Sequence, residues 1–185
     1  MKTIKILILT LALAFIANIC LASSSTFKVY GVFNDEMLTE FNTWYSGLAE
    51  DVDEIHLHIN SPGGGILVLA EMSARIADFK GKVITYNDAM AASAGFALFI
   101  LGDERVGYNS SVYMHHEAAG GSNGKTHELE STVELFKLYQ KSIINRLAKL
   151  GVPSDALKEQ FSLLRDKWFS SEELLKLNVV TKIIE

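Results

Sequence analysis

The stretch EIHLHINSPGGG, residues 54–65, predicts a β-strand followed by a sharp turn, and this pair of elements is the starting point for the fold. Its isoleucines and leucine alternate with polar residues, which is the period of a β-strand with one buried face. The glycines allow a sharp turn, and apolar residues then recur at helical spacing over 66–79. KVITY (82–86) is again strand-like. These residues predict a β-α-β unit with parallel strands.

Strands and helices continue to alternate on both sides of this unit. FKVYGVF (27–33) is strand-like, and Asn34 is placed to cap a helix that runs to about Leu48. The expected elements after residue 86 are a buried helix over 91–101, two short strands within 106–115, a long helix ending at Gly151, a short helix opened by a capping box of Ser170 and Glu173, and a closing strand over 179–184. The pattern predicts an α/β fold, in which loops after the strands hold the functional groups.

Length and composition are those of one globular domain. The chain has 185 residues, of which 49% are hydrophobic and 21% charged. Its net charge is −5 and it contains no basic block, so no nucleic-acid partner is expected. Cys20 is the sole cysteine and precedes the expected domain, which excludes a cysteine nucleophile and a thiolate metal site there. We expect neither a cofactor nor a metal.

The first 22 residues have the layout of a secretory signal. Two lysines are followed by an apolar run and then by small residues, with cleavage expected after Ala22. The alternative is a retained membrane anchor over residues 4–22, since this run is at the lower limit of a bilayer-spanning length. With cleavage, residues 23–185 form a single domain that is periplasmic or secreted. Its stability then depends on packing or oligomerisation instead of disulfides.

Two small-residue segments follow predicted strands. SPGGG (61–65) is either a plain strand-to-helix turn or a place where backbone N–H groups face a developing oxyanion. AMAASAGFAL (89–98) surrounds one hydroxyl, Ser93, which is either a helix cap or a nucleophile with space beside it for a substrate. Serine is a weak nucleophile unless a base takes its proton. The second interpretation of Ser93 therefore requires a histidine.

Five histidines are available as candidate bases. His56 and His58 lie on the polar face of a strand, with no third metal ligand evident, and His127 begins a helix where it is expected to be exposed. His115 and His116 end a strand, so one faces inward and the other outward. An inward histidine at a strand end is either a core residue or a general base.

One acidic residue near the end of the chain completes the set of candidates. Asp166 lies in LLRDKWFS, between an apolar stretch and the last helix. It is either a surface partner for Arg165 or Lys167, or the acid that orients a catalytic histidine and stabilises its cation.

Four segments taken together resemble the proteolytic subunit of the Clp proteases. They occur in the order of that family and at matching intervals along the chain, and they are INSPGG (59–64), AASAG (91–95), NSSVYMHH (109–116) and RDKWFSSEE (165–173). The resemblance implies the ClpP/crotonase-like fold of repeated β-β-α units. It also implies a protruding handle, built from the glycine-rich segment 118–125 and the long helix that follows.

The resemblance implies a serine endopeptidase without a cofactor or metal. Carried over to this chain, it makes Ser93 the nucleophile, His115 the general base and Asp166 the orienting acid. The backbone N–H groups of Gly64 and Ala94 become the oxyanion hole. The expected substrate is a peptide or an unfolded segment, and the expected assembly is a heptameric ring or a double ring of identical subunits.

Two departures from the family leave other functions open. Family members mostly carry Gln-Pro after the base, where this chain has His116-Glu117. An exported protein also has no ATP nearby, so an ATP-driven unfoldase is not the expected partner. The alternatives are a non-catalytic binding or scaffold protein with this fold, an enzyme similar to signal-peptide peptidases with a serine and a lysine, and a crotonase-like acyl-CoA enzyme.

Overall fold

The structure is a computed structural model that describes residues 23–120, 123–162 and 165–185. The expected signal segment, residues 1–22, lies outside the described residues, so export stays a prediction. Within the described ranges, no helix is both long enough and apolar enough to cross a bilayer.

The centre of the molecule is a mostly parallel sheet, which confirms the expected α/β class. Its main path runs β1-β2-β3-β4-β7, and all four pairings along it are parallel. These strands are β1 (Ser23–Phe33), β2 (Val52–Gly64), β3 (Lys82–Ala92), β4 (Glu104–Tyr108) and β7 (Lys182–Ile184). Two further strands, β5 (Val112–His115) and β6 (Lys167–Ser170), extend one end: β5 is parallel to β3, and β6 is antiparallel to β5.

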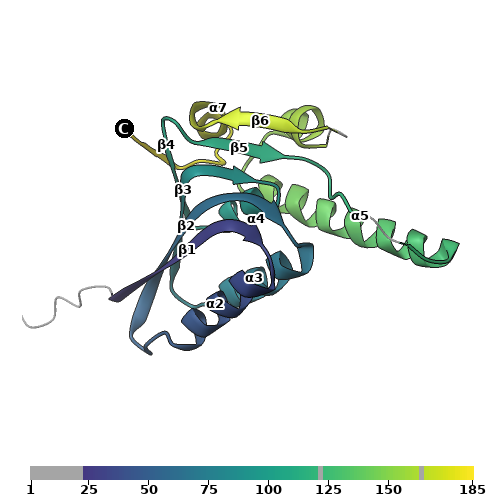
Figure 1. Cartoon of the computed structure of the whole chain (residues 1–185). Helices are drawn as coiled ribbons and strands as arrows, with labels where there is room; N and C mark the ends of the chain where they lie inside the picture. Colours follow the sequence, from purple (N-terminus) through teal and green to yellow (C-terminus); the bar gives the residue numbers. More distant parts are fainter. Residues whose placement is uncertain (1–22, 121–122, 163–164) are drawn as a thin grey trace, which may run out of the picture.

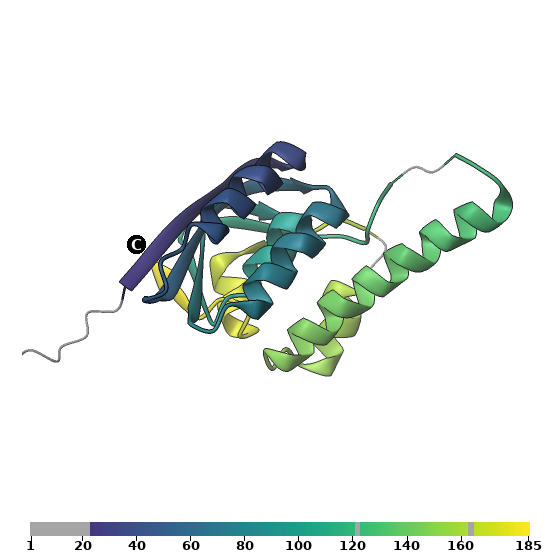
Figure 2. The ribbon, with the colours of Figure 1, turned by 90° about the horizontal axis from the view of Figure 1, so that it is seen from below.

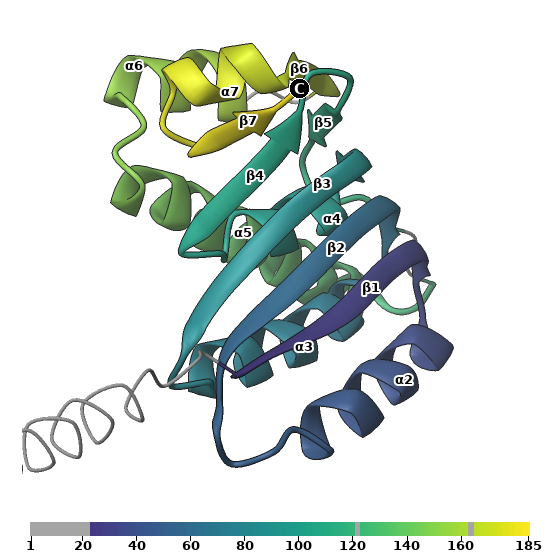
Figure 3. The same ribbon diagram turned by 90° about the vertical axis from the view of Figure 1, so that its left-hand side faces the viewer.

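Helices cover one face of the sheet. The helices α2 (Asp35–Ser46) and α3 (Ile66–Asp78) lie on the same side of β1, β2 and β3, as Figure 3 shows. The short α4 (Ala94–Phe99) packs against β2 and β3. In β2 the isoleucines and leucine at 55, 57 and 59 are fully buried while His56 and His58 are half-buried. The alternation seen in the sequence thus sets which face of the sheet meets the core.

The second half of the chain forms a long helix and a small terminal layer. Helix α5 (Thr126–Lys149) projects beyond the sheet (Figures 1 and 2). At its inner end, Arg146 donates to the carbonyl oxygens of Ile100 and Leu101 at 2.8 and 2.9 Å. The remaining elements are α6 (Ser154–Ala156), the π-helical turn η1 (Leu157–Phe161) and α7 (Ser171–Lys176).

The structure differs from the expected elements mainly around Ser93. The expected helix over 91–101 is shorter, because Ala91 and Ala92 pair with Tyr113 and Met114 of β5 and so end β3. Strand pairing overrides the helical preference of alanine here. The sequence also did not predict β6. Both expected caps are confirmed: the Asn34 side chain accepts from Met37 N at 2.9 Å, and Ser170 and Glu173 form a capping box.

Glycine at position 63 lets β2 end directly against the start of α4. Its φ is +99°, and a Cβ there would lie 2.6 Å from the Cβ of Ser93 and 2.8 Å from the Ala92 carbonyl oxygen. Real Cβ atoms do not approach other atoms this closely. The Ser61 hydroxyl also accepts the N–H of Gly63 at 3.0 Å, which holds the turn in this position.

We predict that Gly63→Ala is much more destabilising than Gly31→Ala. Both glycines have a positive φ, +99° and +88°, but an added Cβ at Gly31 meets no atom within 4 Å. Gly31→Ala is therefore expected to cost about 1 kcal/mol from backbone strain alone, and Gly63→Ala about 3 kcal/mol or more from strain and overlap. Urea unfolding of the two variants measures this difference, and equal losses would contradict the close-contact account.

Candidate active site

Ser93 lies between the end of β3 and the start of α4, in a backbone conformation that presents its hydroxyl to the surface. Its φ and ψ are 54° and −116°, a region that non-glycine residues adopt at a cost of about 1–3 kcal/mol. The turn is held by a bond from Ser93 N to the Met114 carbonyl at 2.9 Å and by one from Ala97 N to the Ser93 carbonyl at 3.0 Å. The side chain forms no cap hydrogen bond. The interpretation of Ser93 as a simple helix cap is therefore wrong.

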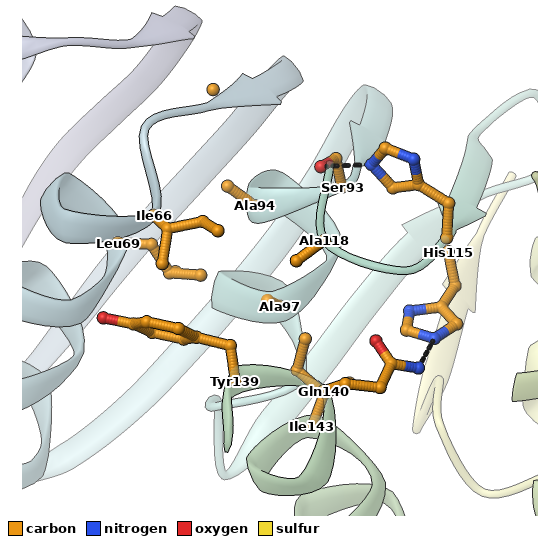
Figure 4. A pocket seen from close by; sticks show the side chains of 12 residues that line it. Ile66, Leu69, Ser93, Ala94, Ala97, His115, Ala118, Tyr139, Gln140 and Ile143 are labelled. Atoms are coloured by element: carbon orange, nitrogen blue, oxygen red, sulfur yellow. Dashed lines mark hydrogen bonds between the residues drawn. The ribbon is translucent and has the colours of Figure 1, made fainter. Parts of the chain in front are cut away.

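His116 is the histidine beside the serine. Its Nε2 lies 2.7 Å from the Ser93 hydroxyl oxygen, a hydrogen bond that Figure 4 draws. The His116 side chain is 25% exposed. A base with Nε2 unprotonated at this distance is placed to accept the hydroxyl proton.

The structure contradicts the expectation that His115 is the partner of Ser93. His115 is 2% exposed, and its Nε2 lies 2.9 Å from the Phe161 carbonyl. It also lies 3.2 Å from the Gln140 amide nitrogen, the contact that Figure 4 draws. Burial lowers the pKa of His115 to about 4, so its ring is neutral near pH 7. An inward side chain at the end of β5 meets the core instead of the nucleophile, and this is the physical reason for the error.

The pairing of β5 with β6 explains why His116, and not His115, faces Asp166. His115 is the last residue of the antiparallel ladder and pairs with Lys167. The same register, extended by one residue, sets His116 opposite Asp166. A shift of one residue would reverse which histidine faces the carboxylate.

Asp166 is close to His116 but loosely held. Its Oδ1 lies 3.5 Å from the Nδ1 of His116, and its side chain is 64% exposed. This separation suits a charge interaction better than a short hydrogen bond. Of the two interpretations of Asp166, its position favours that of a carboxylate facing the histidine, although the histidine is His116 and not His115.

Gly64 and Ala94 both line the small pocket that contains Ser93. The pocket has a volume of about 40 Å³. Gly64 has a φ of +145°, and a Cβ there would lie 2.7 Å from the backbone of Phe33. Ala94 is the first residue of α4, so its N–H has no acceptor within that helix. The rest of the lining is mostly apolar and includes Ile66, Leu69, Ala97 and Ile143 (Figure 4).

The other histidines lie away from this pocket. His56 contacts Glu54 at 2.7 Å and His58 contacts Asp88 at 2.9 Å, and both rings stack on Tyr86. Among the described residues, no three histidine, cysteine, aspartate or glutamate side chains are grouped closely enough to hold a metal. The polar-face interpretation of His56 and His58 therefore fits the structure, with the added finding that each has a carboxylate partner.

One signal in the sequence separates the two adjacent histidines. Along β5, Tyr113 and His115 are buried while Val112 is exposed. Since side chains alternate along a strand, His115 must lie on the same side as the core residue Tyr113. His116 follows the last paired residue and lies where the strand opens to the pocket. The alternation was visible in the sequence; that the inward side is closed by Phe161 was not.

Acid should destabilise this protein through His115. Because the pKa of its buried ring is lowered from 6.5 to about 4, the unfolded chain binds a proton over that range and the folded chain does not. Stability from this residue is complete above about pH 6.5 and falls as the pH drops toward 4, by a total on the order of 3 kcal/mol. We predict that His115→Gln, which lacks a titrating ring, loses less stability than the wild type between pH 7.5 and 4.5 in urea unfolding. Parallel losses in both proteins would contradict this.

Comparison with known proteins gives the family of the chain. The family model described as Clp protease matches residues 21–185. The chain is 27% identical to the ATP-dependent Clp protease proteolytic subunit 3 of Rhizobium johnstonii over 170 residues, which cover 89% of this chain and 86% of the relative. It is 26% identical to the subunit of the same name from Rhizobium meliloti, with 89% and 85% covered. The chain therefore belongs to the Clp protease family.

Proposed function

We propose that this protein is a serine endopeptidase that cleaves peptides or unfolded segments through an acyl-enzyme. The observation that carries the proposal is the 2.7 Å contact between His116 Nε2 and the Ser93 hydroxyl in a pocket open to a substrate. The name of the Rhizobium relatives, proteolytic subunits, supports the same reaction class. His116 replaces His115 as the proposed base, and Asp166 remains the proposed acid.

Acylation begins with proton transfer from serine to histidine. The Ser93 oxygen attacks the carbonyl carbon of the substrate while its proton moves to Nε2 of His116. For this, the Nδ1 of His116 carries the other proton and faces Asp166, whose negative charge stabilises the imidazolium. The tetrahedral intermediate then collapses, and His116 returns the proton to the departing amine. The products are a free amine and an ester on Ser93.

Deacylation repeats these steps with water. His116 takes a proton from a water molecule, the hydroxide attacks the ester carbonyl, and the proton returns to the Ser93 oxygen as the carboxylic acid leaves. In both halves the carbonyl oxygen becomes negative. The N–H groups of Gly64 and Ala94, which line the pocket with Ser93, are the proposed donors to this oxygen.

The pocket suggests which side chain is accepted at the cleaved bond. Ile66, Leu69, Ala97 and Ile143 line it beside Ser93. Burying an apolar side chain among these residues is favourable, and burying a charge without a partner is costly. We therefore propose a preference for an apolar residue before the scissile bond.

The remaining alternatives have less support. A mechanism with lysine as the base would place a lysine at the serine, but among the described residues the pocket lining contains His116 and no lysine. A scaffold protein would not require a histidine bonded to a serine in a backbone conformation of positive φ. A crotonase-like reaction needs an oxyanion hole but no serine nucleophile, so it leaves this contact unexplained.

Helix α5 supports a proposal of self-assembly. Leu129, Val133, Leu135 and Leu138 are 39–65% exposed on it. Beside them, an apolar groove of about 520 Å³ is lined by Val133, Phe136 and Ile144 with two lysines at its margin. We propose that a second copy of this chain covers this helix, as expected for the oligomeric Clp proteases. The number of subunits in the assembly, and a ring or double ring, stay part of the same proposal.

The cellular location of the protein determines which substrates are available to it. If residues 1–22 direct export, no ATP-driven unfoldase is available, and the substrates are peptides or segments that are already unfolded. The N-terminal sequence of the protein recovered outside the cytoplasm would test this, because export with cleavage predicts a start at Ser23.

We predict that a fluorophosphonate probe labels Ser93 and that His116→Gln slows this labelling by at least about a thousandfold. The matched control is His115→Gln, the same change one residue earlier, which is expected to retain far more of the rate because His115 does not contact Ser93. Ser93→Ala abolishes labelling. Mass spectrometry of the modified peptide and the labelling rate are the measurements.

Two outcomes of this comparison would contradict the proposal. Labelling that is equally fast in the wild type and in His116→Gln would exclude His116 as the base. A loss in His115→Gln as large as that in His116→Gln would restore His115 to that role. Hydrolysis of fluorogenic peptides with leucine or aspartate before the cleaved bond tests the pocket, since leucine is expected to be preferred.

Placing a charge on the exposed face of α5 should weaken assembly. We predict that Leu138→Glu lowers the mass of the particle in solution, because the charge would be buried at the contact between copies. The control is Glu134→Gln, an exposed position on the same helix, which is expected to leave the mass unchanged or higher. Sedimentation velocity measures both, and an unchanged mass in Leu138→Glu would count against the proposed surface.

A further inference from the structure

We propose that His115 is a positioning residue that holds Asp166 opposite His116. This inference rests on the proposed function, because it assigns a role within the same site. It concerns a buried polar side chain that the proposed chemistry does not use. Three observations carry it: the contacts of the His115 ring, the attachment of the Asp166 segment, and the loose placement of the Asp166 carboxylate.

The His115 ring is enclosed by groups from three elements. Phe96 of α4 and Phe161 of η1 each lie 5.8 Å from its centre. Gln140 of α5 places its amide nitrogen 3.2 Å from Nε2 and also 3.2 Å from the Phe161 carbonyl. The contact of Nε2 with the Phe161 carbonyl is the shorter of its two, at 2.9 Å, and a carbonyl oxygen only accepts, so a hydrogen bond here places the proton on Nε2.

His115 contacts one described residue on each side of Asp166 in the chain. Through its ring it bonds to the carbonyl of Phe161, at the end of η1. Through its backbone position it pairs with Lys167, the first residue of β6. Asp166 lies between these two attachment points, directly before Lys167. One side chain and one ladder position thus limit where the Asp166 backbone can lie.

The contacts of the Asp166 carboxylate itself are too weak to fix its position, so the position depends on how the backbone is held. It is 64% exposed and reaches His116 at 3.5 Å, and the described structure records no hydrogen bond from its side chain to any other group. An exposed ion pair of this kind contributes little by itself, because solvent screens it and the side chain loses freedom. The position of its backbone therefore decides whether the carboxylate faces His116.

A double-mutant cycle between His115 and Asp166 tests the proposal. The rate of fluorophosphonate labelling of Ser93 is measured in the wild type, His115→Leu, Asp166→Ala and the double variant. Leucine fills the cavity but cannot donate to the Phe161 carbonyl. We expect His115→Leu to slow labelling about tenfold in the wild type and less than about twofold in the Asp166→Ala protein. Equal slowing in both backgrounds would overturn the proposal.

A conservative variant separates the hydrogen bond from packing. His115→Gln can place an amide N–H near the position of Nε2, and we expect it to label within about threefold of the wild type. Slowing as large as in His115→Leu would show that the donor has no part in the effect. Should the leucine variant not fold, His115→Asn takes its place in the cycle, since its shorter amide does not reach Phe161.

A readout without turnover distinguishes this inference from the proposed function. Proton NMR detects a nuclear Overhauser effect between the Asp166 β-protons and the His116 ring protons when the two side chains lie side by side, as their 3.5 Å contact places them. We expect this signal for His116 in the wild type and in His115→Gln, and its loss in Asp166→Ala and in His115→Leu. If the wild type is not labelled by the probe, the proposed function fails, but this pattern would still support the positioning role. Absence of the signal from the wild type, or its persistence in His115→Leu, would overturn it.

Discussion

The close contact between the ends of β2 and β3 is the constraint on which the site depends. The two strands are parallel neighbours, so their carboxyl ends reach the same edge of the sheet. There the glycine at 63 lies so near Ser93 that no Cβ fits between them. This closeness brings the glycine turn and the serine turn into one pocket. Without it, the N–H of Gly64 would lie away from the Ser93 hydroxyl and from the N–H of Ala94, which follows Ser93 directly in the chain.

The second half of the site depends on a different pairing. Strand β5 lies parallel to β3 and delivers Met114 to hold the turn at Ser93, while β6 runs antiparallel to β5 and delivers Asp166. Ser93, His116 and Asp166 follow one another in this order along the chain. They lie side by side in the structure because the strands next to them, β3, β5 and β6, are neighbours in the sheet. Because each position in a ladder is discrete, the register decides which histidine faces Ser93, and only one of the two adjacent histidines can meet both Ser93 and Asp166.

Most of the fold was predictable from local patterns. Alternating residues in β1 and β2, helical spacing in α3 and α5, and the caps at Asn34 and Ser170 are short-range features, and each appears in the structure. The errors occur where distant pairing overrides local preference. Ala91 and Ala92 favour a helix by themselves, yet they complete β3 because β5 lies beside them. Strand β6 is short and exists only through its partner.

The sequence by itself determined the α/β class, the glycine turn, the serine in its small-residue run, and the pair of histidines followed by an acid. All of these follow from residue type and spacing within one segment. Only the tertiary structure decided between His115 and His116, because the difference lies in what surrounds each ring. His115 meets Phe161 and Gln140, which come from other parts of the chain, and the core holds its ring neutral. His116 meets Ser93, because the strand ends one residue before it and the next position opens to the pocket.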